Sequence, residues 1–507
     1  MSLGPDAVKC CRALLAPTYI KQHLDIAPGT PAKALASYLV ICLYCSRGSH
    51  YLMMDETSQV LHNRGHEVWM LLQTGILMIP GKGTFLRRDY LKEYEKWFAD
   101  YTEDLLKGRY YFIIIIMHNF LRSLNCLEKT LNSLKDEKFD ITVVDGFNPC
   151  SFLVAEKLGL PFVAVFPGTF ANGPQVGIPS TLSYVPREEL MSLISAIVQN
   201  QVQTKFENVI KEHFPAGSRP VLSELYLEAE LWIYNTDFSF EFAHLLLPNT
   251  VYIGGLLAKP AKPLSQELED FIANSEDGFI IVTLGSILSS IPLLEVLQEM
   301  NTAFAHLSQG VIWRCQHSKW PKELKLASNV KIADWILQND LLGHPIAHLL
   351  VTHGGLNSLM ESIYHGVPVV GIPLFGDQHD NMVRVEAKNM GIALRIDQLK
   401  ADKFTRPMKQ VIEDKRYKSA VMSLSTIHHS HPLLPDQRLG RWIKHVLQAR
   451  EGAHLQPYTF QQSWYHQYLL YVLLFLSASV LGVIYLCVKL VRTAVFRIRS
   501  SGKQKQT

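Results

Sequence analysis

One stretch of the chain contains side chains whose types and spacing suit recognition of a sugar nucleotide. Trp335 offers an aromatic face, and a Gly-Gly turn at 354–355 precedes a run with helical spacing. Glu361 lies within that run, and Asp377 with Gln378 follows the next apolar segment. An aromatic plate suits a base, backbone amides after a glycine turn suit a diphosphate, and carboxylate or amide groups suit hydroxyls. The set therefore indicates chemistry on a nucleoside diphosphate that carries a sugar.

The elements that must hold these groups follow from the apolar pattern. Residues 349–351 are predicted to form a buried parallel strand, 356–364 a helix that stops at Gly366, and 369–372 the next strand. Ligands of α/β folds bind at the carboxyl ends of the strands. The turn between the first strand and the helix is therefore the expected position of the site.

Three side chains flank the predicted N-terminus of that helix. His353 and Asn357 can donate to phosphate oxygens, where free N–H groups and the helix dipole already favour an anion. Glu361 shares a helix face with Asn357 and can accept from two ribose hydroxyls. Glycine turns are common in α/β loops, and Glu361 could instead pair with a neighbouring Arg; the pattern alone leaves both alternatives open.

This stretch resembles the donor-binding motif of the UDP-glycosyltransferases, the superfamily that includes the UDP-glucuronosyltransferases. The resemblance covers nearly all of residues 46–507 and is closest to the third mammalian family, as in GSHYLMMD, KEHFPAGSRPVL, LLPNTVYIGGL and KQVIEDKRYKSA. One departure is Leu337, where the family usually has Pro. It would loosen the loop under Trp335 but removes no ligand group.

The resemblance implies a role for each side chain of the motif. Trp335 would stack on uracil, Gln338 would read its edge, and Glu361 would hold the ribose. The phosphates would be contacted by Ser286 and His353 and supported by Asn357, and the sugar hydroxyls by Asp377 and Gln378. The implied UDP-sugar-binding set is Ser286, Trp335, Gln338, His353, Gly355, Asn357, Glu361, Asp377 and Gln378. The UDP-sugar is a co-substrate, and no cofactor or metal is expected.

A candidate general base lies far away in sequence. His50 stands between the first predicted strand and the first helix, and imidazole titrates near neutral pH. Asp145 follows the predicted strand 141–144, so its carboxylate would orient the imidazole at the same sheet edge. A helix-capping His and a loop Asp are the alternatives on pattern alone. The resemblance matches His50 and Asp145 to the family's catalytic pair.

Other reactive side chains are given structural interpretations. Cys42 and Cys45 form a lone C-x-x-C inside a strand-like run, and Cys150 has no evident base nearby, so it is predicted to lie in the core. His428, His429 and His431 have no Cys or acid among them and are interpreted as a solvated helix-to-loop segment.

Composition and length favour a two-domain chain with a membrane anchor. The 507 residues are 48% hydrophobic, and the net charge of +3 arises from a tail after Val488 with six Lys or Arg and no acid. Nothing in this balance favours nucleic acid as a partner. The uncharged run 468–488 would span about 31 Å as a helix, enough to cross a bilayer.

The alternation of predicted strands and helices gives an α/β fold class, and the resemblance implies the GT-B fold, in which two Rossmann-like doubly wound domains face a cleft. The expected boundaries, in chain order, are a divergent segment at 1–33, an acceptor-binding domain at 34–257, a linker at 258–264, a UDP-sugar-binding domain at 265–449, a juxtamembrane segment at 450–467, a transmembrane helix at 468–488 and a basic tail at 489–507. The last soluble helix, 435–448, is expected to return across the first domain, as in the family.

The positive-inside rule predicts a cytosolic tail with the preceding domains luminal or outside. The ending KQKQT resembles a dilysine retrieval signal of the endoplasmic reticulum. Residues 1–33 lack the pattern of a signal sequence, which leaves the route of insertion open.

The expected function is transfer of glucuronate, glucose, xylose or N-acetylglucosamine from a UDP-sugar to a hydroxyl of a small lipophilic acceptor, with inversion. The alternative is a membrane-anchored protein that binds a UDP-sugar, is catalytically weak and acts as a partner of related transferases. In either case the chain could form homo-oligomers or hetero-oligomers with related transferases. The absence of G-x-G-x-x-G after the first strand makes an NAD-dependent oxidoreductase remote.

Overall fold

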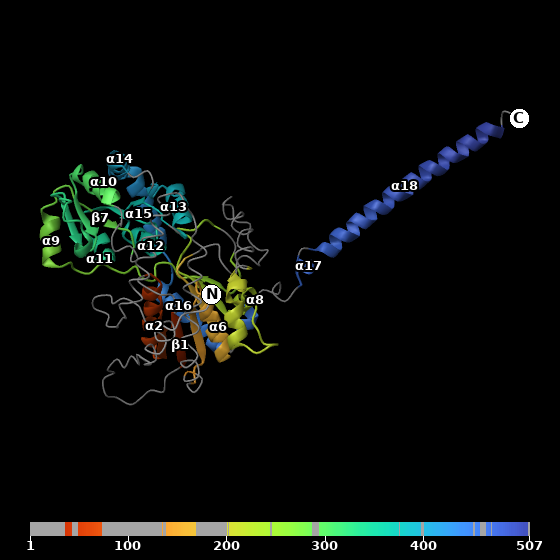
Figure 1. Cartoon of the computed structure of the whole chain (residues 1–507), viewed down its shortest axis with the longest axis horizontal. Coiled ribbons are helices and arrows are strands. Elements are labelled where there is room, and N and C mark those ends of the chain that lie inside the picture. Colours follow the sequence, from red (N-terminus) through yellow and green to blue (C-terminus); the bar gives the residue numbers. More distant parts are fainter. Residues whose placement is uncertain are drawn as a thin grey trace, which may run out of the picture.

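A computed structural model contains two α/β bodies and a long C-terminal helix that projects away from them (Figure 1). It describes residues 36–42, 49–72, 134, 138–168, 200, 202–243, 246–285, 294–374, 376–396, 400–449, 452–456, 463–467 and 469–504.

Each body is built on a six-stranded sheet in which every pairing is parallel. The first sheet contains β1 (Ser37–Cys42), β2 (Glu67–Leu72), β3 (Ile141–Asp145), β4 (Phe162–Phe166), β5 (Leu231–Tyr234) and β6 (Thr250–Tyr252). The second contains β7 (Phe279–Thr283), β8 (Gly310–Arg314), β9 (Val330–Ala333), β10 (Ala347–Thr352), β11 (Val369–Gly371) and β12 (Gly391–Ala393).

Helices connect the strands. The described helices with assigned bounds are α2 (Ser49–His62), α6 (Pro149–Leu158), α8 (Leu222–Leu227), α9 (Gln266–Ala273), α10 (Leu294–Ala305), α11 (Gln338–Leu342), α12 (Leu356–His365), α13 (Gln378–Ala387), α14 (Ala401–Glu413), α15 (Lys415–His429), α16 (Pro435–Ala449), α17 (Trp464–Gln467) and α18 (Leu470–Gln504), with short 3-10 turns at His317–Lys319 and Gly452–Leu455.

Both sheets are buried on both faces, which is why their strands are continuously apolar rather than alternating. In β7, Ile280 and Val282 pack into one core while Phe279 and Ile281 pack into the core on the opposite face. The first sheet likewise separates two apolar clusters. The expected pair of doubly wound parallel sheets is confirmed.

The strand orders place a topological switch point in each sheet. The second sheet has the order β9-β8-β7-β10-β11-β12, and chain direction reverses between β7 and β10. The first has the order β2-β1-β3-β4-β5-β6, with its switch between β1 and β3. Loops that leave neighbouring strands in opposite directions open a crevice there, and ligands of such sheets bind in it.

The chain crosses between the two bodies more than once. The segment 259–263 is exposed, as predicted for a linker, but its backbone is also tied to α11: the amide of Lys259 donates to Oδ1 of Asn339 at 3.0 Å. Further on, α16 lies against α2 and β1 of the first sheet (Figure 1). Leu439, Ile443 and Val446 complete one core of that sheet. The domain boundaries themselves remain predictions.

The segment after β5 also joins the two bodies. Glu241 forms an ion pair with Arg384 of α13, with Oε2 and Nε 2.8 Å apart and both side chains at most 4% exposed. Asp237 accepts from Nδ1 of His428 of α15 at 2.6 Å, and His428 is buried. The interpretation of 428–431 as a solvated segment is therefore wrong for His428, which is buried against an acid from a distant part of the chain.

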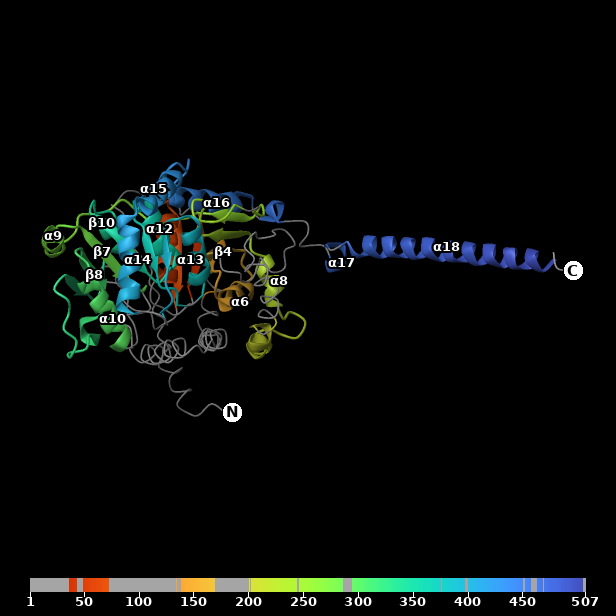
Figure 2. The same ribbon diagram turned by 90° about the horizontal axis from the view of Figure 1, so that it is seen from above.

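The C-terminal helix α18 extends away from both bodies in two perpendicular views (Figures 1 and 2). Its segment Leu470–Arg497 is long and apolar enough to cross a membrane. The helix continues through the basic tail instead of ending near Val488.

Most predicted elements match the observed ones closely. The predicted strand 141–144 and the predicted helix 356–364 match β3 and α12 to within one residue, and the helix after Asp145, α6, is capped by Asn148 rather than by Asp145. Cys150 is fully buried, as predicted. Residues 1–33, Cys45 and nearly all of 80–135, with the apolar run 110–117, lie outside the described residues.

The buried ion pair generates a stability prediction. Glu241→Ala leaves the Arg384 guanidinium buried without its carboxylate, so we expect the free energy of unfolding to fall by about 3–5 kcal/mol. Urea unfolding of the full chain in detergent measures this loss. As a control, Glu267→Ala removes the exposed pair with Lys331, 2.7 Å across, and should leave the urea midpoint nearly unchanged. Equal shifts in the two variants would contradict the prediction.

Candidate functional site

His50 and Asp145 meet at the switch point of the first sheet. His50 lies in the first turn of α2 and Asp145 is the last residue of β3, and Nδ1 of His50 is 2.8 Å from Oδ2 of Asp145. The other oxygen of Asp145 accepts from the amide of Phe147 at 3.0 Å, and the carboxylate is fully buried. The imidazole is 14% exposed. A buried carboxylate on Nδ1 fixes the orientation of the imidazole ring.

The carboxyl edge of the first sheet faces the second body. A Cβ added to Gly168, just after β4, would lie 3.3 Å from Oδ2 of Asp377. Burial raises the pKa of Asp377, and the charge of His50 acts on it in the opposite direction. The predicted base and the predicted sugar-binding carboxylate are thus electrostatic neighbours, although they come from different bodies.

The switch point of the second sheet carries the predicted diphosphate cradle. Gly355 is the N-cap of α12, and Gly354 before it has φ +82°. The ring of His353 packs on Gly285 at the end of β7, where a Cβ would lie 2.5 Å from Nε2. Since Gly285 also has φ +82°, a side chain there would be both strained and blocked.

His353 contributes a hydrogen bond rather than a charge. Burial, together with the nearby Arg314 guanidinium, lowers its pKa to about 4, so the imidazole is neutral at physiological pH. Arg314, which the sequence analysis missed, supplies a positive charge at this edge. In the sequence, the one feature that points to Arg314 is its position at the carboxyl end of β8. The contacts that give Arg314 its role are made with residues distant in the sequence.

Arg314 connects the aromatic plate to the cradle. Its guanidinium carbon lies 4.9 Å from the centre of the Trp335 ring, and it donates to the carbonyl of Gly285. The cation–π contact holds the indole in place while the charge stays beside Gly285. Arg314 therefore links the predicted uracil position to the predicted phosphate position.

Gln338 and Glu361 are brought together as one group. Nε2 of Gln338 donates to Oε2 of Glu361 at 2.6 Å. Glu361 is half-buried, and burial raises its pKa to about 7 despite that hydrogen bond. The alternative that Glu361 is the partner of a neighbouring Arg has no support among the ion pairs of the described residues.

Asp377 and Gln378 begin α13, but the structure gives them different surroundings. Asn381 donates to Oδ2 of Asp377 at 2.7 Å and to the carbonyl of Gly354 at 3.0 Å, tying the start of α13 to the turn before α12. Gln378 is buried, and its Oε1 accepts from the amide of Leu374 at 2.8 Å. After Arg314, Asn381 is another residue of the candidate site that the sequence analysis missed.

Two further expectations concern the loops. Ser286, predicted to contact phosphate, and Phe375, considered for sugar selectivity, lie outside the described residues. Leu337 caps α11 with φ −82°, near the φ that Pro would fix at this position.

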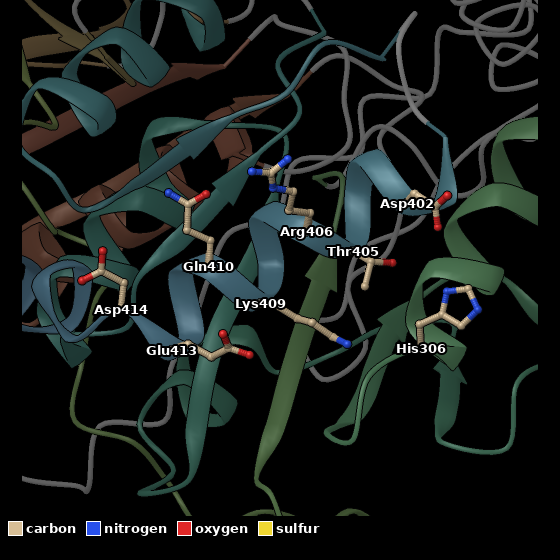
Figure 3. A pocket seen from close by; sticks show the side chains of 8 residues that line it. All are labelled: His306, Asp402, Thr405, Arg406, Lys409, Gln410, Glu413 and Asp414. Carbon is tan, nitrogen blue, oxygen red and sulfur yellow. The ribbon is translucent and has the colours of Figure 1, made fainter.

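A separate hollow of about 630 Å³ lies along α14 on the outer side of the second body (Figure 3). Its walls mix exposed acids and bases, and none of the predicted site residues lines it. Among the residues that the structure describes, no group of three His, Cys, Asp or Glu is arranged to hold a metal.

The fold and the opposed switch points define the class of the protein. Over 82% of this chain and 98% of the other, it matches the crystal structure of the glycotransferase of kitacinnamycin with a TM-score of 0.54 and 16% sequence identity. The expected GT-B fold is thereby confirmed. The chain belongs to the family described as UDP-glucoronosyl and UDP-glucosyl transferase, whose profile matches residues 39–505.

Relatives within the family confirm the resemblance to the third mammalian group. UDP-glucuronosyltransferase 3A1 of Homo sapiens is 49% identical over 492 residues, which cover 91% of this chain and 94% of that protein. UDP-glucuronosyltransferase 3A2 of Homo sapiens is 48% identical over 514 residues, 95% of this chain and 98% of that protein.

The raised pKa of Glu361 predicts how nucleoside binding depends on pH. Ribose hydroxyls donate best to the ionised carboxylate, so uridine should bind more tightly as the pH rises through about 7. Uridine is chosen because it lacks a phosphate that titrates in this range. Calorimetry across about pH 6 to pH 8 measures the effect, and Glu361→Gln should flatten the profile. A slope retained in Glu361→Gln would assign the titration to another group.

Proposed function

We propose that the protein transfers a sugar from a UDP-sugar to a hydroxyl of a small lipophilic acceptor with inversion at the anomeric carbon. The observation that carries this proposal is the apposition of the His50–Asp145 pair, 2.8 Å across, and the cradle around α12 at facing switch points. Family membership supports UDP-sugar transfer, and the relatives named above are glucuronosyltransferases.

In the proposed mechanism, Nε2 of His50 removes the proton from the acceptor hydroxyl. The oxygen attacks the anomeric carbon as the bond from that carbon to the β-phosphate oxygen breaks, and UDP departs. Asp145, held by the amide of Phe147, stabilises the imidazolium that forms. A single in-line displacement of this kind inverts the anomeric configuration.

Charge that develops on the departing UDP would be stabilised by fixed groups. The amides at the start of α12 point toward the cradle, neutral His353 offers one N–H, and Arg314 contributes a permanent positive charge. Because these groups are held by packing before the reaction, they require little reorganisation as charge moves.

The surroundings of Asp377 favour an uncharged donor sugar. Its carboxylate would repel the carboxylate of glucuronate. Arg384, further along α13, is already paired with Glu241, so it does not supply a compensating charge for glucuronate. Among the four donors considered, glucose, xylose and N-acetylglucosamine are therefore favoured over glucuronate.

We further propose that α18 anchors the protein in the endoplasmic reticulum membrane, with both bodies luminal and the basic end cytosolic. The apolar segment Leu470–Arg497 and the positive charges within and after it support this orientation. Juxtamembrane aromatic residues such as Tyr465 suit the interface.

The mechanism predicts that His50→Ala removes most turnover, by a factor of about 10² to 10⁴, while UDP affinity is unchanged. Acceptor glycosylation followed by mass spectrometry measures turnover, and calorimetry measures UDP binding. His344→Ala is the matched control, since that imidazole pairs with Glu269 at 3.7 Å on the opposite edge of the second sheet. Full activity in His50→Ala would refute the assignment of the base.

A UDP-release assay in microsomes distinguishes the enzyme from a binding partner of related transferases. The donors are UDP-glucuronate, UDP-glucose, UDP-xylose and UDP-N-acetylglucosamine, with one phenolic acceptor. We expect acceptor-dependent release with an uncharged donor. UDP binding without release from any donor would favour the binding protein instead.

A further inference from the structure

Asn235 joins the first body to the diphosphate cradle through both ends of its amide. It follows β5 and is 1% exposed. Its Oδ1 accepts from the amide of Leu256 at 3.1 Å, and its Nδ2 donates to Oδ1 of Asn357 at 2.6 Å. The three residues form a continuous chain of hydrogen bonds from the backbone near the linker to the first turn of α12.

The direction of this chain is fixed by its first member. A backbone amide can only donate, so the atom of Asn235 that faces Leu256 must be the oxygen. The nitrogen of Asn235 therefore faces Asn357, and a nitrogen that donates requires an oxygen opposite. Exchanging the oxygen and nitrogen of either side-chain amide would break at least one of the two hydrogen bonds.

This direction decides what Asn357 offers to a ligand. With its oxygen held by Asn235, the NH2 group of Asn357 points away from Asn235, beside the N-terminus of α12. Phosphate oxygens only accept hydrogen bonds, so they need that NH2 group. A reversed amide would present an oxygen and repel the diphosphate.

We infer that Asn235 is a positioning residue for donor binding: it sets the donor polarity of Asn357 from the other domain. The inference rests on the proposed binding of a UDP-sugar at α12. Diphosphate recognition by the second body thus depends on an amide of the first, and on the backbone of Leu256 just before the linker.

The test compares UDP with uridine, which lacks the phosphates, in the full chain in detergent. Asn235→Leu removes the amide at similar volume and lets Asn357 rotate, so the Kd for UDP should rise several-fold. Asn235→Asp can only accept from Asn357, so it should draw the NH2 group away from the ligand and raise the Kd roughly tenfold or more. Uridine affinity should stay constant in both variants.

Asn301→Ala is the matched control, because Asn301 is likewise buried and uses both ends of its amide, but toward backbone groups away from the site: Nδ2 donates to the carbonyl of Lys325 at 2.9 Å, and Oδ1 accepts from the amide of Ala327 at 3.0 Å. It should lower the melting temperature without changing the ratio of UDP to uridine affinity. If Asn235→Leu acted only by weakening the fold, it too would lower the melting temperature and leave the ratio of UDP to uridine affinity unchanged.

A double-mutant cycle tests whether Asn235 acts through Asn357. Asn357→Ala should weaken UDP binding, and Asn235→Leu should then add nothing to that loss. Full additivity, or equal losses of UDP and uridine affinity in Asn235→Leu, would overturn the inference while leaving the proposed function intact. If Asn357→Ala itself binds UDP as tightly as the natural chain, the phosphate role of α12 fails and the inference fails with it.

Discussion

The site depends on one geometric constraint: two parallel sheets must present their carboxyl edges to each other. A parallel sheet gathers loops from distant parts of a chain at one edge, and a switch in strand order opens space there. In this protein the first edge holds an imidazole braced by a buried carboxylate, and the second holds a helix N-terminus with an arginine and an aromatic ring. The proposed reaction needs both edges, because the proposed base lies on the first and the proposed nucleotide site on the second.

Contacts of the segment after β5 keep these edges in register. Asn235, Asp237 and Glu241 reach α12, α15 and α13 in turn. Each contact is polar and largely removed from water, so a misplaced partner would leave a buried group unsatisfied. Apolar packing would tolerate sliding, whereas paired polar groups specify a single arrangement.

The sequence predicted what is local and periodic. The strand 141–144 and the helix 356–364 were predicted to within one residue because an apolar run defines a buried strand and helical apolar spacing before a Gly defines a helix. The His50–Asp145 pair and the α12 cradle followed from strand ends and from the family resemblance. Arg314, Asn235 and the buried state of His428 could not be predicted in this way. Their roles arise from partners up to 191 positions away, and no local pattern encodes such pairings.

Burying ionisable groups in the site costs folding free energy, and a bound ligand would offset part of that cost. Burial raises the pKa of Glu361 and of Asp377 and lowers that of His353, so the charged form of each group is disfavoured. Hydroxyl groups of a ligand would donate hydrogen bonds to the two carboxylates and so stabilise their ionised forms. Such a cradle gives up some folding free energy in exchange for groups that are already in place.

The return of α16 to the first sheet has a consequence for biosynthesis. Leu439, Ile443 and Val446 cover an apolar face whose other residues begin near Tyr38, so this core is assembled from the two ends of the soluble chain. A ribosome delivers those ends about 400 residues apart, and at roughly 5–20 residues per second the early face waits for tens of seconds. Until then the part of this face that α16 covers stays exposed to solvent, which favours binding of chaperones to the nascent first domain.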